Sequence, residues 1–348
     1  MYPSEAERKR VRDTIQKLQN RLTSLLGNVI VIPVGSTAKE TFTAGDHDID
    51  LYIQIADKTT AYETVKKAFP NGQRKEGQLL IWNANVDGFD VDFVFQITKK
   101  REDTCKHTEY YNTHLTKQMK REVVRAKEFF KGVGVYGAEN GGIIGVAVEE
   151  MIRKYGTLEN LARKLTEKKI YLQDPTLTTK RDLLASIIPR RLEQLQVACK
   201  QFLKDKLIPK RKIEALFEER YAGYNKILFA RKKDRGSDFD KIFSQCEHTK
   251  RILQNQEPEV DVDFDVLVTK QEIIVYYKAT PEKLSSTREV CLDPNILPQE
   301  AIQQFKAKHE TYVKASFICA QIKRNFTSPT QAFNRTVLTR TRSYTRKT

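Results

Sequence analysis

The chain has 348 residues and a formal net charge of +16 at pH 7. This length allows two to four domains with buried cores, and positive charge spread along the whole chain predicts a polyanionic partner, nucleic acid before a membrane surface. No apolar run approaches the roughly 18 residues of a spanning helix, and the charged start MYPSEAERKRVRD is unlike a secretory signal, so we expect no membrane partner.

The cysteines indicate a reducing compartment. There are five, an odd number, and they are far apart: Cys105, Cys199, Cys246, Cys291 and Cys319. No Cys-x-x-Cys or Cys/His zinc spacing occurs among them. Reduced thiols in a cytoplasmic protein are therefore expected.

The first 100 residues read as a small mixed sheet with helices. Ser4 can cap a helix that runs to about Leu26, with Glu7 as a capping-box partner. Its apolar stripe is predicted to be buried and consists of Val11, Ile15, Leu18, Leu22 and Leu25. A second helix is expected over residues 60–68, and strands over residues 29–34, 48–55, 78–82 and 89–97.

The Gly35-Ser36 turn and the aspartates that follow it carry the chemistry. Residues 29–34 form an apolar run that ends at this turn. From Asp48 the pattern alternates, so Asp48 and Asp50 project from one strand face, roughly 7 Å apart along the strand. Such a pair suits two Mg²⁺ ions bridged by carboxylate and triphosphate oxygens.

A third carboxylate is expected from a neighbouring strand. Residues 85–97 alternate in the same way, and Asp92 is the chosen third ligand, with Asp90 as its rival. The chain also contains a comparison case, because Asp261, Asp263 and Asp265 alternate equally well without a Gly-Ser turn before them. We interpret that second set as an exposed strand face.

These motifs resemble a known family. GSTAK (residues 35–39), DHDIDLYI (46–53) and GFDVDFVF (88–95) are similar to the signature of the archaeal-type (class I) CCA-adding enzymes, tRNA nucleotidyltransferases of the polymerase-beta-like superfamily. The resemblance continues through HTEY (107–110) and EVVRAKEFFKGVGVYGAE (122–139) and is specific over about residues 31–202. It implies transfer of a nucleotide from CTP or ATP to the 3′ end of tRNA, with two Mg²⁺ ions held by Asp48, Asp50 and Asp92.

The resemblance also implies a nucleotide-binding set. Gly35 and Ser36 would bind the β- and γ-phosphates through the turn, and Lys39 stands where the family commonly has arginine, which removes the bidentate fork. His107, Lys127 and Tyr136 would complete the triphosphate pocket. Two departures limit the comparison: the loop after Glu139 is short, and the family's base-reading arginine near Gln194 has no equivalent in register.

The rest of the chain is expected to bind RNA. Residues 115–201 read as helical, and residues 225–279 give a strand–helix–strand–strand order typical of a small α+β platform. From Lys323 onward no acidic residue occurs, while Phe326, Phe333 and Tyr344 lie among the cations. This run predicts contacts with RNA backbone from Lys323, Arg324, Arg335, Arg340 and Arg342.

The predicted fold is therefore α+β, with a polymerase-beta-like mixed sheet, a helical central domain and a small α+β RNA-binding domain. We expect a catalytic domain at 1–100, a helical domain at 101–205, an α+β body at 206–285 and a shortened basic tail at 286–348. Another superfamily activity, either poly(A)-type tailing or oligo- or cyclic-nucleotide synthesis, stays open. So do an inactive RNA-binding paralogue and a homodimer.

Overall fold

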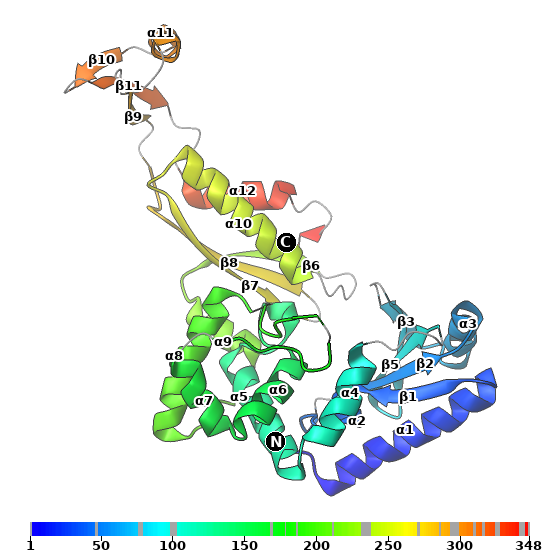
Figure 1. Cartoon of the computed structure of the whole chain (residues 1–348). Helices are drawn as coiled ribbons and strands as arrows, with labels where there is room; N and C mark the ends of the chain where they lie inside the picture. Colours follow the sequence, from blue (N-terminus) through cyan, green and yellow to red (C-terminus); the bar gives the residue numbers. More distant parts are fainter. Residues whose placement is uncertain are drawn as a thin grey trace. The chain divides into compact units, whose positions relative to one another are not determined.

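The computed structural model describes residues 2–45, 48–75, 79–97, 103–167, 170–177, 179–185, 187–210, 212–230, 238–269, 272–284, 287–292, 299–308, 311–314, 317–323, 328–340 and 345–346. The chain divides into two compact units, whose elements are labelled in Figure 1. The first is mainly Met1–Ala222, and the second consists mostly of residues from Gly223 onward. The four-part division expected from the sequence stays a prediction.

A five-stranded mixed sheet begins the first unit. Its strands, in sheet order, are β1 (Ile30–Val34), β2 (Asp48–Gln54), β5 (Phe89–Gln96), β4 (Leu80–Val86) and β3 (Gly72–Lys75). β2 and β5 are parallel, and the other neighbouring pairs are antiparallel. The predicted mixed sheet is confirmed. Sequence reasoning missed β3, because its residues Gly-Gln-Arg-Lys show no apolar alternation.

Two helices, α1 (Glu5–Leu26) and α3 (Lys58–Ala68), cover one face of this sheet. The buried stripe of α1 was predicted correctly except for Leu25, which is 41% exposed; Leu26 packs against the core in its place. Ser4 caps α1 as expected, since its Oγ accepts the Glu7 N–H at 3.1 Å. The Glu7 carboxylate accepts the Gly45 N–H at 2.9 Å.

The opposite face of the sheet is divided between apolar and acidic residues. Towards the ends of β2 and β5, Tyr52 and Val94 pack with Val34 and with Cys105 of α4 (Asp103–His114). Towards their beginnings the same face carries aspartates. The carboxylates therefore lie beside the patch that α4 covers. They are on the face of the sheet opposite the hydrophobic core that α1 and α3 form with the sheet, called the α1–α3 core below.

The helical region has its own core around α5 (Lys117–Val133). The surrounding elements are η1 (Ala138–Asn140), α6 (Gly145–Tyr155), α7 (Leu158–Glu167), α8 (Pro189–Asp205) and α9 (Ile213–Arg220). Arg191 of α8 is fully buried; it donates to the Asn140 carbonyl at 3.1 Å and lies over the Phe217 ring. Within the described ranges, no helix combines the length and apolarity needed to cross a bilayer.

The second unit contains a four-stranded sheet and a smaller three-stranded one. The larger has the order β12 (Thr345–Arg346), β6 (Asn225–Ala230), β8 (Glu272–Thr280) and β7 (Asp261–Val268), with α10 (Asp238–Gln256) between β6 and β7. The smaller has the order β10 (Thr311–Lys314), β11 (Phe317–Lys323) and β9 (Thr287–Leu292), with α11 (Gln299–Lys308) between β9 and β10. The predicted strand–helix–strand–strand order over 225–280 is confirmed.

The second aspartate series was interpreted wrongly in part. Asp261 is exposed and Asp263 is half-buried, but Asp265 is completely buried on β7. The Asp263 carboxylate accepts the Tyr224 hydroxyl at 2.6 Å, and that of Asp265 accepts the Val266 N–H at 2.8 Å. The beginning of β7 is solvated on one face, whereas its later residues are covered on both faces. One alternating pattern therefore spans two environments.

The basic C-terminal run contains a helix that contributes to the core. In α12 (Pro329–Arg340), Phe333 is fully buried and stacks on Tyr277 of β8 with ring centroids 5.0 Å apart. It also lies 6.1 Å from the ring of Phe264, which contacts Phe243 of α10. Phe333 therefore belongs to the core of this unit, although it lies within the basic run that was expected to contact RNA.

This packing predicts the effect of truncating Phe333. Phe333→Ala should lower the free energy of unfolding by about 3 kcal/mol or more, since it removes a fully buried ring and leaves a cavity. Exposed Arg335 on the same helix gives the control, because Arg335→Ala should cost under about 1 kcal/mol. Urea unfolding of both variants checks this, and equal stability would contradict the packing of α12 on the sheet.

Candidate active site

The register of two parallel strands brings the predicted carboxylates together. Asp50 of β2 lies opposite Asp92 of β5, and Asp48 lies opposite Asp90. Side chains alternate along each strand, so all of these aspartates share the face opposite the α1–α3 core. Asp48 is exposed, whereas Asp50, Asp90 and Asp92 are half-buried. Adjacent strands lie about 4.8 Å apart, which makes Asp50 and Asp92 immediate neighbours.

The charges of these side chains act on one another. Burial, and after it the carboxylates of Asp92 and Asp48, raise the pKa of Asp50 to about 7. Crowded carboxylates are the hard oxygen donors that Mg²⁺ prefers, so the chemistry of this donor set fits the predicted ion. Among the residues described, however, no group of three or more acidic, His or Cys side chains has the arrangement of a metal site.

Two side chains that sequence reasoning missed hold the Asp92 carboxylate. Lys75 Nζ lies 2.6 Å from Asp92 Oδ2, and Asn83 Nδ2 donates to Oδ1 at 2.7 Å. Burial acts to lower the pKa of Lys75, but the charges of Asp92, Asp48 and Asp50 keep it above its ordinary value. The Lys75 ammonium therefore lies within the field of all three carboxylates. No sequence signal marks Lys75.

The Gly-Ser turn is the start of a one-turn helix, α2 (Gly35–Ala38), directly after β1. Gly35 has φ +76°, and a Cβ at this position would lie 2.2 Å from Asp50 Oδ2. Its N–H donates to Thr108 Oγ1 at 3.3 Å. Backbone conformation and close approach both require glycine here, which brings the predicted phosphate-binding turn against the predicted metal ligand.

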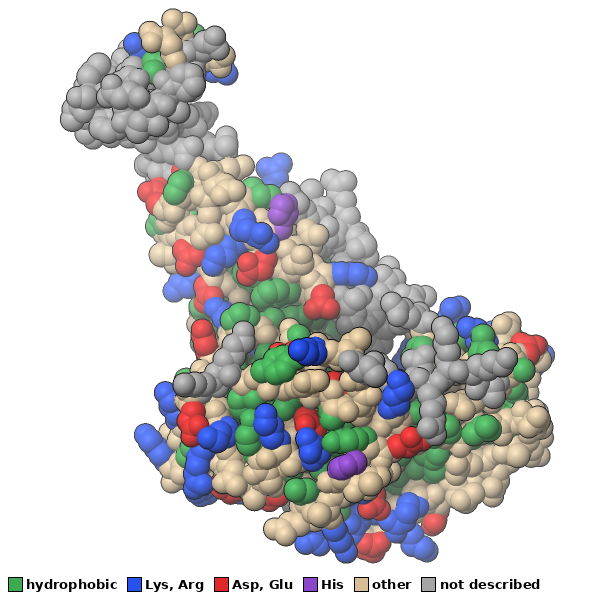
Figure 2. All heavy atoms as spheres, viewed as in Figure 1, with side chains coloured by type: hydrophobic (Ala, Val, Ile, Leu, Met, Phe, Trp, Pro, Cys, Tyr) green, Lys and Arg blue, Asp and Glu red, His purple; other side chains and the backbone are tan. Residues whose placement is uncertain are grey.

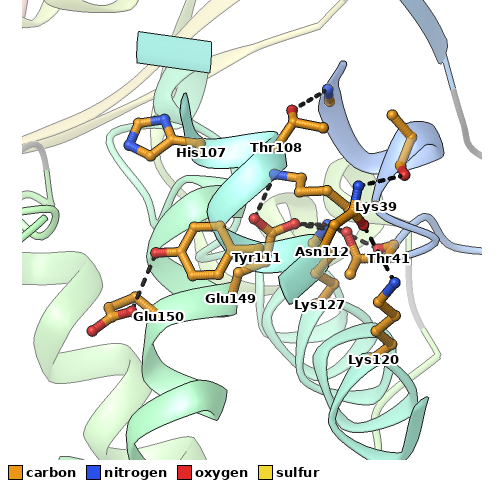
Figure 3. A network of polar contacts seen from close by, with 12 residues as sticks. Lys39, Thr41, His107, Thr108, Tyr111, Asn112, Lys120, Lys127, Glu149 and Glu150 are labelled. Atoms are coloured by element: carbon orange, nitrogen blue, oxygen red, sulfur yellow. Dashed lines mark hydrogen bonds and ion pairs between the residues drawn. The ribbon is translucent and has the colours of Figure 1, made fainter. Parts of the chain in front are cut away.

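The two lysines of the predicted nucleotide-binding set meet in a buried cluster (Figure 3). Lys39 Nζ contacts Glu149 Oε2 at 2.5 Å. Lys127 Nζ donates to the Thr41 carbonyl at 2.9 Å and lies 3.7 Å from Glu149 Oε1. Thr41 Oγ1 donates to the same oxygen at 2.6 Å. Glu149 was missed, although an acidic residue on the apolar face of the GVAVEEMI helix was a signal for a buried partner.

Tyr136 lies next to this cluster. A Cβ built at Gly145 would be 3.2 Å from the Tyr136 hydroxyl oxygen and 3.8 Å from Lys127 Nζ, so both polar groups converge on the first residue of α6. The backbone N–H groups of a helix N-terminus favour anions. Lys127 and Tyr136 are thus brought together as the motif predicted.

His107 is buried on α4 and makes a different contact. Its Nε2 lies 2.8 Å from Asp174 Oδ2, and Asp174 is completely buried. Burial acts to raise the pKa of Asp174, but hydrogen bonds from Thr176 and His107 hold it below its ordinary value. His107 therefore ties α4 to residues 170–177. Its role in nucleotide binding stays a prediction.

The predicted RNA-binding cations are spread over several elements. Lys323 ends β11, Arg340 ends α12, and Arg335 is exposed on α12. Arg324 and Arg342 lie outside the described residues. RNA binding by these cations stays a prediction.

Residues 15–118 match the family model of the nucleotidyltransferase domain. They include the Gly35-Ser36 turn, Asp48, Asp50 and Asp92. This stretch is a nucleotidyltransferase domain. The geometry above therefore lies largely within the stretch that this family model matches.

Curated archaeal CCA-adding enzymes are similar to a longer part of the chain. The Methanosarcina acetivorans enzyme is 30% identical over 187 residues, which cover 46% of this chain and 41% of that one. The Thermoplasma volcanium enzyme is 28% identical over 237 residues (58% and 54%), and the Saccharolobus islandicus enzyme 26% identical over 253 residues (61% and 60%). The resemblance predicted from the motifs is confirmed, and the chain matches 41% to 60% of the length of these relatives.

A solved structure of the Cid1 poly(U) polymerase covers 62% of this chain and 94% of that chain, with a TM-score of 0.50 and 12% identity. At this identity the likeness concerns the fold alone. Together with the domain match, it confirms the predicted α+β fold of the polymerase-beta-like type.

The Gly35 geometry gives a prediction about stability. Gly35→Ala should lower the free energy of unfolding by about 2–4 kcal/mol, because a side chain there adds a clash with Asp50 to the strain of a positive φ. Gly27 has φ +71° with open space around its Cβ, so Gly27→Ala should cost only about 1 kcal/mol. Chemical unfolding of the two variants measures the difference, and equal losses would contradict the close approach to Asp50.

The raised pKa of Asp50 predicts that replacing its carboxylate with a neutral group stabilises the fold at high pH but not at low pH. The pKa of this carboxyl rises from 3.8 to about 7 on folding. Its contribution to the free energy of unfolding is therefore full below pH 3.8 and is lost as the pH rises to about 7. Such a pKa change corresponds to roughly 4 kcal/mol, and partial exposure reduces this to about 2 kcal/mol. Asp50→Asn, which mimics the neutral form, should therefore gain about 2 kcal/mol at pH 8 in EDTA and nothing below pH 4.

Urea unfolding across this pH range checks the prediction. Asp13→Asn, which removes an exposed carboxylate on α1, is the control and should leave the pH profile unchanged. A gain at pH 8 no larger than that of the control would show that neither burial nor the neighbouring carboxylates disfavour the charged form of Asp50.

Proposed function

We propose that this protein is a template-independent tRNA nucleotidyltransferase that adds or repairs the 3′-terminal CCA using CTP and ATP. The observation that carries the proposal is the register of β2 and β5, with Asp50 opposite Asp92 and Asp48 two residues before Asp50 on the same face. Gly35 touches Asp50 from the adjoining turn. Carboxylates beside a Gly-Ser turn match what transfer of a nucleotide from a triphosphate requires.

Asp48, Asp50 and Asp92 would hold Mg²⁺, as the oxygen-rich donor set favours. When bound, the metal ions would lower the pKa of the RNA 3′-hydroxyl and neutralise charge on the departing pyrophosphate. Before that, the Lys75 ammonium and the Asn83 amide hold Asp92 in place on the face of the sheet. Lys75 thus offsets part of the negative charge that the register creates.

The triphosphate would lie towards the lysine cluster. Ser36 and the backbone of α2 follow directly after β1, and Lys39 ends this segment. The Lys39 ammonium acts to lower the pKa of Asp50, so it lies within electrostatic reach of the carboxylates. Lys127 and Tyr136 converge at Gly145 and would add positive charge and a hydroxyl donor.

The acceptor is proposed from charge and from the relatives. A net charge of +16 suits a polyanion, and the relatives that match up to 61% of this chain are CCA-adding enzymes. The cations expected to contact RNA are Lys323, Arg324, Arg335, Arg340 and Arg342.

A labelled-nucleotide assay tests the function. Purified protein incubated with Mg²⁺ and a tRNA lacking its 3′ CCA should incorporate CTP and then ATP and should not extend with UTP or GTP. Asp48→Ala should reduce transfer by at least about a thousandfold, as loss of an essential catalytic group does. The matched control is Asp261→Ala, which changes an equally exposed aspartate of an Asp-x-Asp strand and should retain activity.

The other outcomes identify the alternatives. Long A-tails or U-tails would replace CCA addition with RNA tailing. A 2′–5′ or cyclic product formed without added RNA would indicate a nucleotide synthetase. Tight tRNA binding without any incorporation would leave an RNA-binding paralogue.

A further inference from the structure

Two buried ammonium groups share one buried carboxylate at the junction of the sheet and the helices. Lys39 follows α2, Lys127 lies on α5 and Glu149 on α6, and their side chains point toward one another in Figure 3. The three residues are 5%, 3% and 1% exposed. Glu149 thus contacts two of the residues expected to bind the triphosphate, although no motif assigned it a role.

The charges in this cluster do not balance. Besides Glu149, the described groups that face the two ammonium groups include the Thr41 hydroxyl and carbonyl oxygens and the Tyr111 ring, 5.6 Å from Lys39 Nζ, and these are uncharged. Burial, together with the Lys39 and Lys131 charges, lowers the pKa of Lys127 to about 8, although the Glu149 charge opposes this change. The cluster therefore carries an excess of positive charge in surroundings that screen it poorly.

Neighbouring Glu150 provides a comparison. It is also buried, but its carboxylate accepts two hydrogen bonds from Arg153, both at 2.7 Å, and one from the Tyr111 hydroxyl at 3.2 Å. One carboxylate with one guanidinium leaves no excess of charge. Figure 3 shows Glu149 and Glu150 turned toward different partners.

We infer that Glu149 is an internal counter-ion of the nucleotide site, which neutralises part of the charge of Lys39 and Lys127 and so weakens binding of the triphosphate. The inference rests on the proposed function. Glu149 acts as a positioning residue through the two lysines and needs no contact with the nucleotide. Because the effect is electrostatic, it extends beyond the atoms that touch.

The inference separates Glu149 from a residue with only a structural role. Loss of Glu149 removes the partner of Lys39 and the acceptor for Thr41, so the nucleotide-free protein should become less stable. A purely structural role would also weaken ligand binding, because the site would lose its shape. A counter-ion instead predicts tighter binding, since the bound triphosphate becomes the main anion near the two lysines.

The experiment measures ligand binding by calorimetry at pH 7 and constant ionic strength. The ligands are tripolyphosphate and a non-hydrolysable ATP analogue with Mg²⁺. Glu149→Gln should bind both about tenfold more tightly than the wild type, as one buried charge near the ligand implies. Glu150→Gln should bind as the wild type does, and circular dichroism checks that each variant is folded.

Glu149→Asp keeps the measurement possible if Glu149→Gln fails to fold. It retains the charge but shortens the side chain and lengthens the 2.5 Å contact to Lys39. A gain in affinity of about twofold to threefold is then expected.

The results separate the two hypotheses. A wild-type protein that binds neither ligand would refute the proposed function. Binding by the wild type with unchanged or weaker affinity in the folded Glu149 variants would overturn the counter-ion role alone. An equal gain in Glu150→Gln would do the same, because the effect would then not depend on the two lysines.

Discussion

The aspartates on β2 and β5 repel one another, and the other charged groups of the site are arranged to compensate this repulsion. Parallel pairing fixes Asp50 opposite Asp92, and the strands cannot shift by one residue because Ile49, Leu51, Val91 and Phe93 would then leave the α1–α3 core. Burial of the apolar face thus holds the carboxylates together against their mutual repulsion. Burial of Asp50 and the charges of its neighbours together raise the pKa of this carboxyl, which shows the cost of the arrangement.

The compensating cations come from two directions. Lys75 reaches Asp92 from the edge strand β3, and Lys39 acts on Asp50 from the end of α2. Lys75 forms an ion pair with Asp92, whereas Lys39 forms its ion pair with Glu149 in the helical region. The aspartates form a negative cluster beside the positive cluster of Lys39 and Lys127. A metal-bound triphosphate has the complementary charges: its metal ions would bind the aspartates, and its phosphate oxygens would lie near the lysines.

Local periodicity predicted the carboxylates but could not predict their partners. Strict alternation places Asp48 and Asp50 on one face of their strand and Asp92 on the polar face of another, because a strand has a side-chain period of two. Lys75 lies on a short polar strand without that pattern, and Glu149 interrupts an apolar helix face whose local sequence does not name its buried partners. Asp265 was misread, and the burial of Phe333 was not predicted, for the same reason: whether a patterned residue is covered depends on elements distant in sequence.

The buried lysine cluster also explains how a ligand could stabilise the junction between the sheet and the helices. Segment 39–41 follows the sheet, whereas Lys127 and Glu149 belong to the helical core, so their contacts join two hydrophobic cores through ions. Buried ion pairs contribute little net stability, because desolvation offsets their attraction. A junction of this kind is therefore sensitive to any added anion. Because a ligand that binds only the folded state stabilises it by mass action, nucleotide binding and cohesion of the two cores should rise together.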